Sequence, residues 1–404
     1  MIFYLSKKLR NWLKILRICF LSFEYPPYVI GGAGVYAENI TKELLDLGHE
    51  VHVMSPSIRY PKNRFLLRKK FVHHEIPTIH RRFLNISSFW FNLSRKYKKI
   101  SKNAGGFDIL HSNDMSDFSL LSCQVNIPRV ITIHHLAYQV AKNFSLLQRL
   151  SNITGEIGLS PLIEKAVISR PDKIIAVSNY TKKSLISIYK ILPSRIEVIP
   201  NGINVDGYSF PENEILECKK LLGVLNCFTF LFVGRLNDPR KNLLLVLNAL
   251  KIMCREKSVK LILVGSGYNT KLRKIISSLG IEKKVIVLGS VDDVTLKKCY
   301  CACDALVSTS LLEGFGLVLL EAMASRKPIV ALNRGAVSEL VRNGVNGFLV
   351  ENSDPQELAA SMVFLIDHPN DTLRIGNRNR EWASNFSWAK SAKCIEKVYN
   401  SIIS

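Results

Sequence analysis

Residues 16–54 read LRICFLSFEYPPYVIGGAGVYAENITKELLDLGHEVHVM. The mostly apolar residues 16–23 predict a short buried strand, and a turn-rich segment with two prolines leads to the glycine loop 31–34. The apolar positions of residues 35–47 keep the spacing of a helix, and Gly48 is a good residue to cap its end. Residues 51–54 predict a second strand. This order of strand, glycine loop, helix and strand is typical of a doubly wound parallel sheet.

The same alternation occurs twice along the chain. Further strands are predicted at 109–111, 130–133 and 173–177, and a strand then runs into the turn signal Pro-Asn-Gly at 200–202. Strands after this break are predicted at 228–233, 261–264, 285–288, 305–308, 329–331 and 348–350. We therefore expect an α/β fold of two Rossmann-like domains, an N-terminal domain over 15–205 and a C-terminal domain over 206–380. A helix over 381–404 follows, and residues 1–14 form a leader.

Composition excludes several classes of protein. The 404 residues include 55 Lys and Arg against 33 Asp and Glu, a formal charge of +22, and 47% are hydrophobic. A chain this apolar can bury a core, so it is not disordered. No uncharged apolar run approaches the roughly 18 residues that span a bilayer, and the first residues lack the order of a signal peptide. We expect a cytoplasmic protein whose nine cysteines, Cys299, Cys301 and Cys303 included, are mostly buried thiols without metal-site spacing.

Positive charge gathers in the first half of the chain. Residues 1–200 hold 29 basic and 13 acidic side chains, and residues 51–100 hold 12 basic side chains against the single acid Glu75, with aromatic residues between them. An anionic membrane surface or nucleic acid is the candidate partner. Residues 1–14 have the spacing of a short basic amphipathic helix, which could lie in a headgroup layer, pack on the domain or fray.

Two cations follow the predicted strand 228–233. The next segment, 234–242, reads GRLNDPRKN, and its Arg235 and Lys241 can converge on one ligand at the carboxyl edge of a sheet. Such a pair would stabilise a diphosphate leaving group. Surface charges that flank a turn are the alternative interpretation.

Two glutamates follow the predicted strand 305–308. Residues 308–324 read STSLLEGFGLVLLEAMA, with Glu313 in a loop and Glu321 about two turns into an apolar helix. Carboxylates suit sugar hydroxyls, and the N–H groups of a helix start suit a phosphate. The apolar neighbours of Glu321 argue against an exposed position, and a largely buried carboxylate needs a bound partner.

Two glycine loops are weaker signals. Gly31 and Gly32 let the backbone approach a ligand, and a phosphate could lie at the helix start behind them, although many tight turns contain glycine for conformation alone. The segment VGSG at 264–267 has Thr270 in place of the third glycine of a dinucleotide fingerprint, and no acidic residue ends the next strand. We interpret it as a strand-to-helix turn and not as an NAD site.

With these residues the chain resembles a retaining glycosyltransferase of the two-domain GT-B fold, in the family called family four or group one. The resemblance extends to the segments 24–27, 48–51, 177–180 and 199–202 and runs from about residue 15 to the C-terminus. It implies two Rossmann-like domains that face a cleft and a nucleotide-sugar donor, which is a UDP-, GDP- or ADP-sugar. It also implies departure of the nucleoside diphosphate with attack from the same face, without a metal or another cofactor.

The resemblance assigns roles to the residues named above. Glu321 would bond the ribose, Arg235 and Lys241 would neutralise the diphosphate, and Glu313 would hold hydroxyls of the transferred sugar. Donor contacts would also come from the backbone of Phe315, Gly316, Leu317 and Val318 and, when the cleft closes, from Gly31 and Gly32. His134 matches a histidine that lies beside the donor sugar in the family. It is followed by His135 where the family often has Asp, and Lys241 is followed by Asn242 where glycine is common.

The basic N-terminal domain suggests the acceptor. We expect a lipid-linked or other glycan acceptor at the inner face of the membrane, reached by peripheral docking through residues 51–100 and 1–14. A sugar-nucleotide epimerase or a phosphorylase of the same fold is an alternative, as is a donor-binding protein without catalysis. A nucleic-acid-binding protein that uses residues 64–99 would leave Glu313 and Glu321 unexplained, so we expect no nucleic-acid partner.

Overall fold

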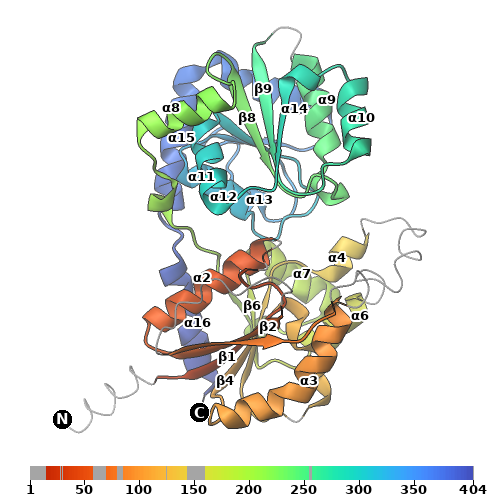
Figure 1. The fold of residues 1–404 in the computed structure, drawn as a ribbon, viewed down its shortest axis with the longest axis vertical. Coiled ribbons are helices and arrows are strands. Elements are labelled where there is room, and N and C mark those ends of the chain that lie inside the picture. Colours follow the sequence, from red (N-terminus) through yellow and green to blue (C-terminus); the bar gives the residue numbers. More distant parts are fainter. Residues whose placement is uncertain are drawn as a thin grey trace, which may run out of the picture. The chain divides into compact units, whose positions relative to one another are not determined.

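The computed structural model describes residues 15–27, 29, 31–57, 70–79, 85–123, 125–142, 160–253 and 257–403. The chain forms two compact units, one of Met1–Pro200 with Trp388–Ser404 and one of Asn201–Ser387. Each unit is a parallel sheet with helices on both faces (Figure 1), so the predicted α/β fold is confirmed. The units divide after Pro200 and after Ser387, whereas the sequence placed these divisions at 205 and 381. The leader 1–14 lies outside the described residues.

The first unit contains a seven-stranded sheet in the order β3-β2-β1-β4-β5-β6-β7. Every strand pairs in parallel with its neighbours. The strands are β1 (Arg17–Ser22), β2 (Glu50–Pro56), β3 (Phe71–Ile76), β4 (Ile109–Asn113), β5 (Arg129–Ile133), β6 (Lys173–Ala176) and β7 (Ile196–Val198). The helices are α2 (Gly32–Asp46), α3 (Asn85–Asn103), α4 (Ala137–Lys142), α6 (Ser160–Ile168), α7 (Asn179–Tyr189) and α16 (Trp388–Ile402), with the 3-10 helices η1 (Asp114–Ser122) and η2 (Pro193–Arg195).

Alternate residues of β1 face the two helical layers, because successive side chains of a strand point to opposite faces. Cys19 and Leu21 pack in a core with Phe89 of α3. Phe20, on the other face, packs against His111, whose ring in turn meets Tyr399 of α16 edge-on. Helix α16 lies beside α2 on this face (Figure 1). The last helix of the chain therefore completes the core of the first unit.

The segment 51–100, which we predicted to be a basic docking stretch, contains more regular structure than its sequence pattern indicated. It contains the edge strand β3 and the helix α3, which the sequence pattern did not reveal. Phe89 is fully buried, and Phe71 stacks on Tyr25 with ring centroids 6.4 Å apart. Only Phe91, at 59% exposure, is an exposed large apolar side chain of α3 in the described part of the chain. Of the aromatic residues in this segment, Phe89 belongs to the core of the first unit and Trp90 packs against that core.

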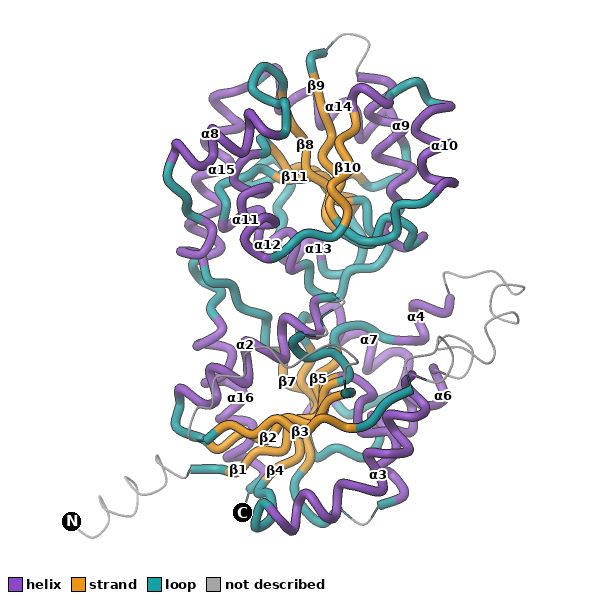
Figure 2. The backbone as a smooth tube through the Cα atoms, in the orientation of Figure 1, coloured by secondary structure: helices purple, strands orange, loops and turns teal. Residues whose placement is uncertain are grey.

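The second unit contains a six-stranded parallel sheet in the order β10-β9-β8-β11-β12-β13. Strands β8, β9, β10 and β11 of this sheet are labelled in Figure 2, with helices around them. The strands are β8 (Phe228–Val233), β9 (Val259–Val264), β10 (Val285–Gly289), β11 (Ala305–Ser308), β12 (Ile329–Leu332) and β13 (Phe348–Val350). The helices are α8 (Glu212–Leu221), α9 (Leu243–Met253), α10 (Thr270–Ser278), α11 (Asp293–Ala302), α12 (Leu317–Ala324), α13 (Val337–Leu340), α14 (Pro355–Asp367) and α15 (Pro369–Ala383). Short 3-10 helices are η3 (Val205–Tyr208), η4 (Pro239–Lys241) and η5 (Glu282–Lys284).

The C-terminal segment predicted as one helix over 381–404 contains the end of one helix and the whole of another. Helix α15 belongs to the second unit, and α16 begins at Trp388 in the first unit. Residue 381, the predicted start of the last helix, lies inside α15. The short interruption at residues 384–387 contains no proline or glycine, which is why the sequence pattern gave no signal for it.

Candidate functional site

The order of the strands in the second unit sets the position of the candidate site. From β8 the chain adds β9 and β10 on one side of the sheet, and then β11, β12 and β13 on the other. β8 and β11 are therefore neighbours whose following loops diverge, and ligands of open α/β sheets bind at the carboxyl ends of such strands. Arg235 and Lys241 follow β8, while Ser310 and Glu313 follow β11.

Lys241 and Glu313 meet at this point. The Lys241 Nζ lies 2.8 Å from Glu313 Oε1 and donates to Ser310 Oγ at 3.2 Å. The two charged side chains are 24% and 13% exposed, so solvent reaches the pair but does not surround it. A cation and a carboxylate in contact can together bind a sugar diphosphate: the cation binds the phosphates, and the carboxylate accepts hydrogen bonds from the sugar hydroxyls.

Backbone contacts fix the two loops against each other. Thr309 Oγ1 donates to the carbonyl oxygens of Lys241 and Asn242, each at 3.0 Å, and Leu311 N donates to Arg240 O at 2.7 Å. Asn242 has φ of +49° and ends η4 directly before α9. Asparagine tolerates this left-handed conformation better than most residues, so Asn242 serves where the family commonly has glycine.

Arg235 is held by Asp238. Its guanidinium lies 3.0 Å from Asp238 Oδ2, and its side chain is 47% exposed. Arg240 donates to the same carboxylate through Nε and Nη2. Burial alone would raise the pKa of Asp238, but the hydrogen bonds from Arg240 and the charges of Arg240 and Arg235 hold it below its usual range. Both predicted phosphate cations are thus paired with carboxylates: Arg235 with Asp238 of its own loop, and Lys241 with Glu313 of the loop after β11.

Two glycines support these loops by close packing. A Cβ on Gly335 would lie 2.2 Å from Glu313 O, and the next residue, Ala336, donates its N–H to that oxygen at 2.8 Å. A Cβ on Gly265 would lie 1.9 Å from Gly234 O. The VGSG turn therefore packs against the loop that carries Arg235, as expected of a structural turn. Gly335 had not been singled out in the sequence.

Helix α12 places the second glutamate. Gly316, with φ of +99°, precedes Leu317 and Val318, the first residues of the helix, and Phe315 is buried beneath them. Glu321 lies little more than one turn into α12, and not the two turns that we predicted. It is half-buried, and Tyr300 donates to its Oε2 at 2.7 Å. Burial raises the pKa of Glu321 to about 7. The sequence predicted that this buried carboxylate needs a bound partner, and the Tyr300 hydroxyl of the same unit is the partner of one of its oxygens.

The first unit has its own point of divergence between β1 and β4. Asn113, at the end of β4, donates through Nδ2 to Ser22 Oγ and to Ala33 O, each at 3.0 Å. Its Oδ1 lies 2.7 Å from His134 Nε2. Asn113 thereby joins the end of β1, the glycine loop and the histidine after β5. The sequence analysis did not single it out.

His134 is a buried neutral imidazole. Burial lowers its pKa to about 4, and because Asn113 Oδ1 can only accept, Nε2 carries the proton and Nδ1 is an acceptor. The backbone N–H of His134 donates to Asp114 Oδ1 at 3.1 Å. Burial also raises the pKa of Asp114, although the charge of His135 acts in the opposite direction. At neutral pH His134 can accept a hydrogen bond from a hydroxyl but cannot act as a cation.

The glycine loop is less open to an anion than its sequence suggests. The N–H of Gly31 donates to Glu24 Oε2 at 2.8 Å, so a carboxylate already occupies the first donor of the loop. Nothing lies within 4 Å of the position that a Cβ on Gly31 would take, which leaves its backbone accessible from that side. Gly32 begins α2. Gly31, Gly32 and His134 belong to the first unit, and the other predicted site residues belong to the second.

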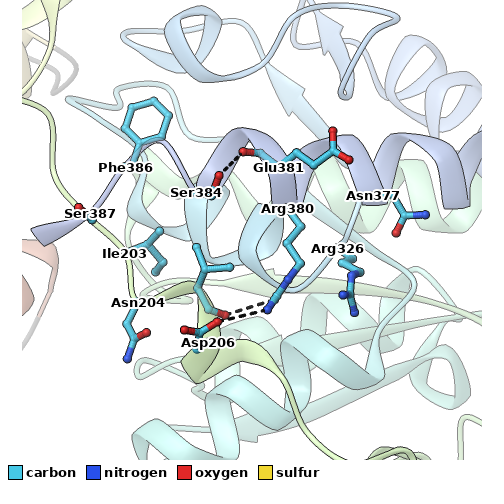
Figure 3. Close-up of a pocket in the computed structure, with 11 residues that line it drawn as sticks. Ile203, Asn204, Asp206, Arg326, Asn377, Arg380, Glu381, Ser384, Phe386 and Ser387 are labelled. Carbon is cyan, nitrogen blue, oxygen red and sulfur yellow. Dashed lines mark hydrogen bonds and ion pairs between the residues drawn. The ribbon is translucent and has the colours of Figure 1, made fainter. Parts of the chain in front are cut away.

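A separate hollow of about 740 Å³ lies where the chain enters and leaves the second unit (Figure 3). Arg380 lines it and donates to Val205 O at 3.2 Å and to Ala324 O at 2.6 Å. Asp206, 3.8 Å from the same guanidinium, also faces the hollow. No predicted site residue lines it, and Arg380, one of its two arginines, is engaged in holding η3 to α12.

Two further features bear on the classes of function considered above. Within the described ranges, we find no helix with the length and hydropathy that a bilayer crossing requires. Cys299, Cys301 and Cys303 are buried, and burial raises the pKa of the Cys299 thiol to about 12. In the described part of the chain, no three His, Cys, Asp or Glu side chains gather as metal ligands would.

Comparison with known proteins identifies the family. A model described as Glycosyltransferase Family 4 matches residues 30–206, and one described as Glycosyl transferases group 1 matches residues 219–382. An uncharacterized glycosyltransferase of Methanocaldococcus jannaschii is 30% identical over 403 residues, which cover 96% of this chain and 99% of that protein. The chain belongs to the group 1 glycosyltransferases. The two family models together cover every strand of the two sheets except β1, and the segments that carry Arg235, Lys241, Glu313 and Glu321.

This glycosyltransferase is also similar to proteins with named activities. The phosphatidyl-myo-inositol mannosyltransferase of Mycolicibacterium smegmatis is 28% identical over 412 residues, with 96% of this chain and 94% of that protein covered. The Anabaena protein HepE, crystallised with UDP and glucose, has a TM-score of 0.75 at 24% identity and covers 95% of this chain and 99% of its own. The similarity to HepE shows the fold, which is GT-B.

Proposed function

We propose that this glycosyltransferase transfers a sugar, with retention of configuration and without a metal, from a nucleotide sugar to an acceptor hydroxyl. The contact between Lys241 and Glu313 carries the proposal, because it unites a phosphate-binding cation and a hydroxyl-binding carboxylate at the carboxyl ends of β8 and β11. HepE, which shares the fold, is crystallised with UDP and glucose, and we propose a nucleotide-sugar donor for this chain too.

Each residue has a part in the proposed transfer. Lys241 and Arg235 stabilise the charge that develops on the departing diphosphate, which positioned cations can do without a metal. Glu313 accepts hydrogen bonds from the transferred sugar, and Glu321 accepts them from the ribose. The backbone N–H groups at the start of α12 supply further donors to the phosphates. His134, on the first unit, accepts a hydrogen bond from a sugar hydroxyl through Nδ1.

For the acceptor we propose a lipid-linked or other glycan at the inner face of the membrane. Helix α3 supports this choice, because its buried face carries Phe89, Leu93 and Tyr97, while a run of basic residues on its other faces is exposed, namely Arg95, Lys96, Lys98, Lys99 and Lys102. An exposed basic helix face is attracted to anionic lipid. One similar enzyme, the Mycolicibacterium mannosyltransferase, is named for a phosphatidyl-inositol acceptor.

A donor screen tests the reaction. Purified protein is incubated with UDP-, GDP- and ADP-sugars, and nucleoside diphosphate release is followed with and without extracted membrane lipids. We expect release with one donor, stimulated by lipid, and its loss in Glu313→Ala but not in the matched surface variant Glu282→Ala. The anomeric configuration of the product, measured by NMR, tests retention. Epimerised donor without any acceptor would instead favour the epimerase alternative.

A vesicle-binding assay tests the membrane separately. Reversal of four charges on α3 (Arg95, Lys96, Lys98 and Lys99 to Glu) is expected to abolish binding to anionic vesicles at physiological ionic strength. Reversal of four exposed charges in the second unit serves as the control (Lys271, Arg273, Lys274 and Lys283 to Glu). Equal binding of both variants would remove the membrane from the proposal and leave the transfer reaction in place.

A further inference from the structure

The carboxylate of Glu321 contacts a fully buried tyrosine. Tyr300, in α11, is 0% exposed, and its hydroxyl donates to Glu321 Oε2 at 2.7 Å. The ring of Tyr208, in η3, meets the Tyr300 ring edge-on with centroids 5.9 Å apart. Cys301 Sγ donates to Tyr208 O at 3.3 Å. Residues of three elements, η3, α11 and α12, therefore converge on one side of a single carboxylate.

Two of these elements, η3 and α12, bond to the same arginine. Arg380, in α15, donates to Val205 O at the start of η3 and to Ala324 O at the end of α12. Its Nη2 also donates to Ser209 Oγ at 2.9 Å. Because one guanidinium bonds to both η3 and α12, Tyr208 is held near the helix that carries Glu321. Tyr300 is fully buried against the Tyr208 ring, which restricts its movement as well.

The Tyr300 hydroxyl has a role that packing alone does not explain. A phenylalanine would fill the same space without bringing a polar group into the core, where an unpaired hydroxyl is costly. A carboxylate has about four acceptor positions, and the phenol takes one of them. Glu321 is only half-buried, so its carboxylate remains within reach of a ligand. A hydrogen bond to a charged acceptor is strong enough to fix its orientation.

We propose that Tyr300 is a positioning residue for the nucleoside part of the donor: it holds the Glu321 carboxylate in the orientation that accepts hydrogen bonds from the two ribose hydroxyls. This inference rests on the proposed function, in which Glu321 binds the ribose. It adds a residue outside the predicted site and predicts which part of the ligand that residue affects.

The charges around Glu321 give the inference a pH signature. The carboxylate is faced by Tyr300, Asp293 and Lys297 of α11 and by Tyr208 of η3. Burial raises its pKa to about 7, and hydrogen bonds from Tyr300 and, to a smaller extent, from Tyr208 oppose this rise. Loss of the hydroxyl therefore raises the pKa further. Since the ribose hydroxyls bind the ionised carboxylate, the pH of half-maximal nucleotide binding moves upward.

Calorimetric titration of the full chain with UDP, GDP, ADP and inorganic pyrophosphate tests the inference. Tyr300→Phe is expected to bind the preferred nucleoside diphosphate about tenfold more weakly than the wild type. Pyrophosphate, which lacks a ribose, should bind both proteins equally. The double variant with Glu321→Gln should bind no more weakly than Glu321→Gln alone, and the donor KM should rise with little change in kcat. Tyr25→Phe, which removes a buried hydroxyl bonded to Thr41 at 2.9 Å in the first unit, is the matched control.

Failure of the Tyr300 positioning role and failure of the proposed transfer reaction give different results. Unchanged nucleotide affinity in Tyr300→Phe, or an equal loss of pyrophosphate affinity, overturns the positioning role while leaving the proposed transfer reaction intact. An unmoved pH of half-maximal binding in Tyr300→Phe also overturns it. A wild-type protein that binds none of the three nucleoside diphosphates overturns the proposed function and the inference together.

Discussion

The two sheet edges that carry the predicted site residues are built in opposite ways. In the first unit, Asn113 and His134 form a buried neutral network with Ser22 and Ala33. In the second unit, Lys241 and Glu313 form an ion pair that solvent reaches. A buried network of neutral groups is rigid because an unpaired member is costly, whereas a solvated ion pair can exchange partners at little cost. The first edge is suited to shape the site and the second to bind the changing charge of the diphosphate.

The largest expected effect comes from removal of a charge at the second edge. Lys241→Ala should lower kcat by about 10²–10³, the usual consequence of losing one group that stabilises transition-state charge. Steady-state release of nucleoside diphosphate measures it. Lys257→Ala, which breaks an ion pair with Asp367 at the amino end of β9, should retain full activity, because the site lies at the carboxyl ends of the strands. Equal loss in both variants would mean that Lys241 acts through general stability.

A smaller loss of activity is expected when the backbone contact that supports Glu313 is disturbed. Gly335→Ala places a Cβ 2.2 Å from Glu313 O and should lower kcat/KM about tenfold or more, because misplacement of a binding group by about 1 Å is costly. Gly344→Ala is the matched control, since Gly344 has φ of +72° against +68° for Gly335 but has nothing within 4 Å of its Cβ position. If both variants lose the same activity, backbone strain and not the clash is responsible.

The network of the first edge should affect stability more than donor binding. Asn113→Ala leaves the His134 Nε2–H and the Ala33 carbonyl without their partner, and an unsatisfied buried group costs about 1–3 kcal/mol of the free energy of unfolding. Denaturant unfolding measures this loss. Asn92→Ala removes an exposed bond to Pro77 O and should be near neutral. A neutral Asn113→Ala would contradict the interpretation of this edge as a rigid network.

The smallest expected effect depends on pH and concerns the support of the loop after His134. Glu164 is 2% exposed and accepts from the N–H groups of Ala137 and Tyr138 and from the Tyr189 hydroxyl. Burial raises its pKa from the ordinary 4.5 to about 7, so between these values the folded protein binds more protons than the unfolded chain. This group therefore adds stability as the pH falls from 7 to 4.5.

Glu164→Gln removes that contribution. The difference in the free energy of unfolding between the wild type and this variant should be larger at pH 5 than at pH 8, by about 1–3 kcal/mol. Unfolding curves at both values give the difference directly. Glu197→Gln, at a half-exposed carboxylate of the same unit, controls for loss of a charge. A difference that shrinks toward pH 5 would show that Glu164 is not protonated in the folded state.

The sequence revealed the second edge better than the first. Arg235, Lys241, Glu313 and Glu321 stand at fixed spacings after two apolar strands, and parallel strands bring the residues behind them to the same edge of a sheet. Charged residues directly after apolar strands stand out in a sequence, and they indicate a ligand-binding site. The pairing of Arg235 with Asp238 and the support of Glu313 by Gly335 depend on the loop backbone, which no periodicity describes.

The first edge is mostly hidden in the sequence because neutral polar residues at strand ends are common. Asn113 has no spacing or charge that distinguishes it, and its role follows only from the bonds to Ser22, Ala33 and His134. The secondary structure of the basic segment was hidden for a related reason. Its charges indicated a surface, but Phe89, Leu93 and Tyr97 recur at every fourth residue and form the buried face of α3. That helical period was present in the sequence, and the density of charge obscured it.

The central claim is that the second edge holds the donor through its two cations, and equilibrium binding of UDP, GDP and ADP tests it most directly. The wild type should bind one of these nucleotides, the double variant Arg235→Ala with Lys241→Ala should lose that binding, and Asn113→Ala should retain it within about threefold at a temperature where it remains folded. Unchanged affinity in the double variant would contradict the account, as would loss of binding in folded Asn113→Ala alone.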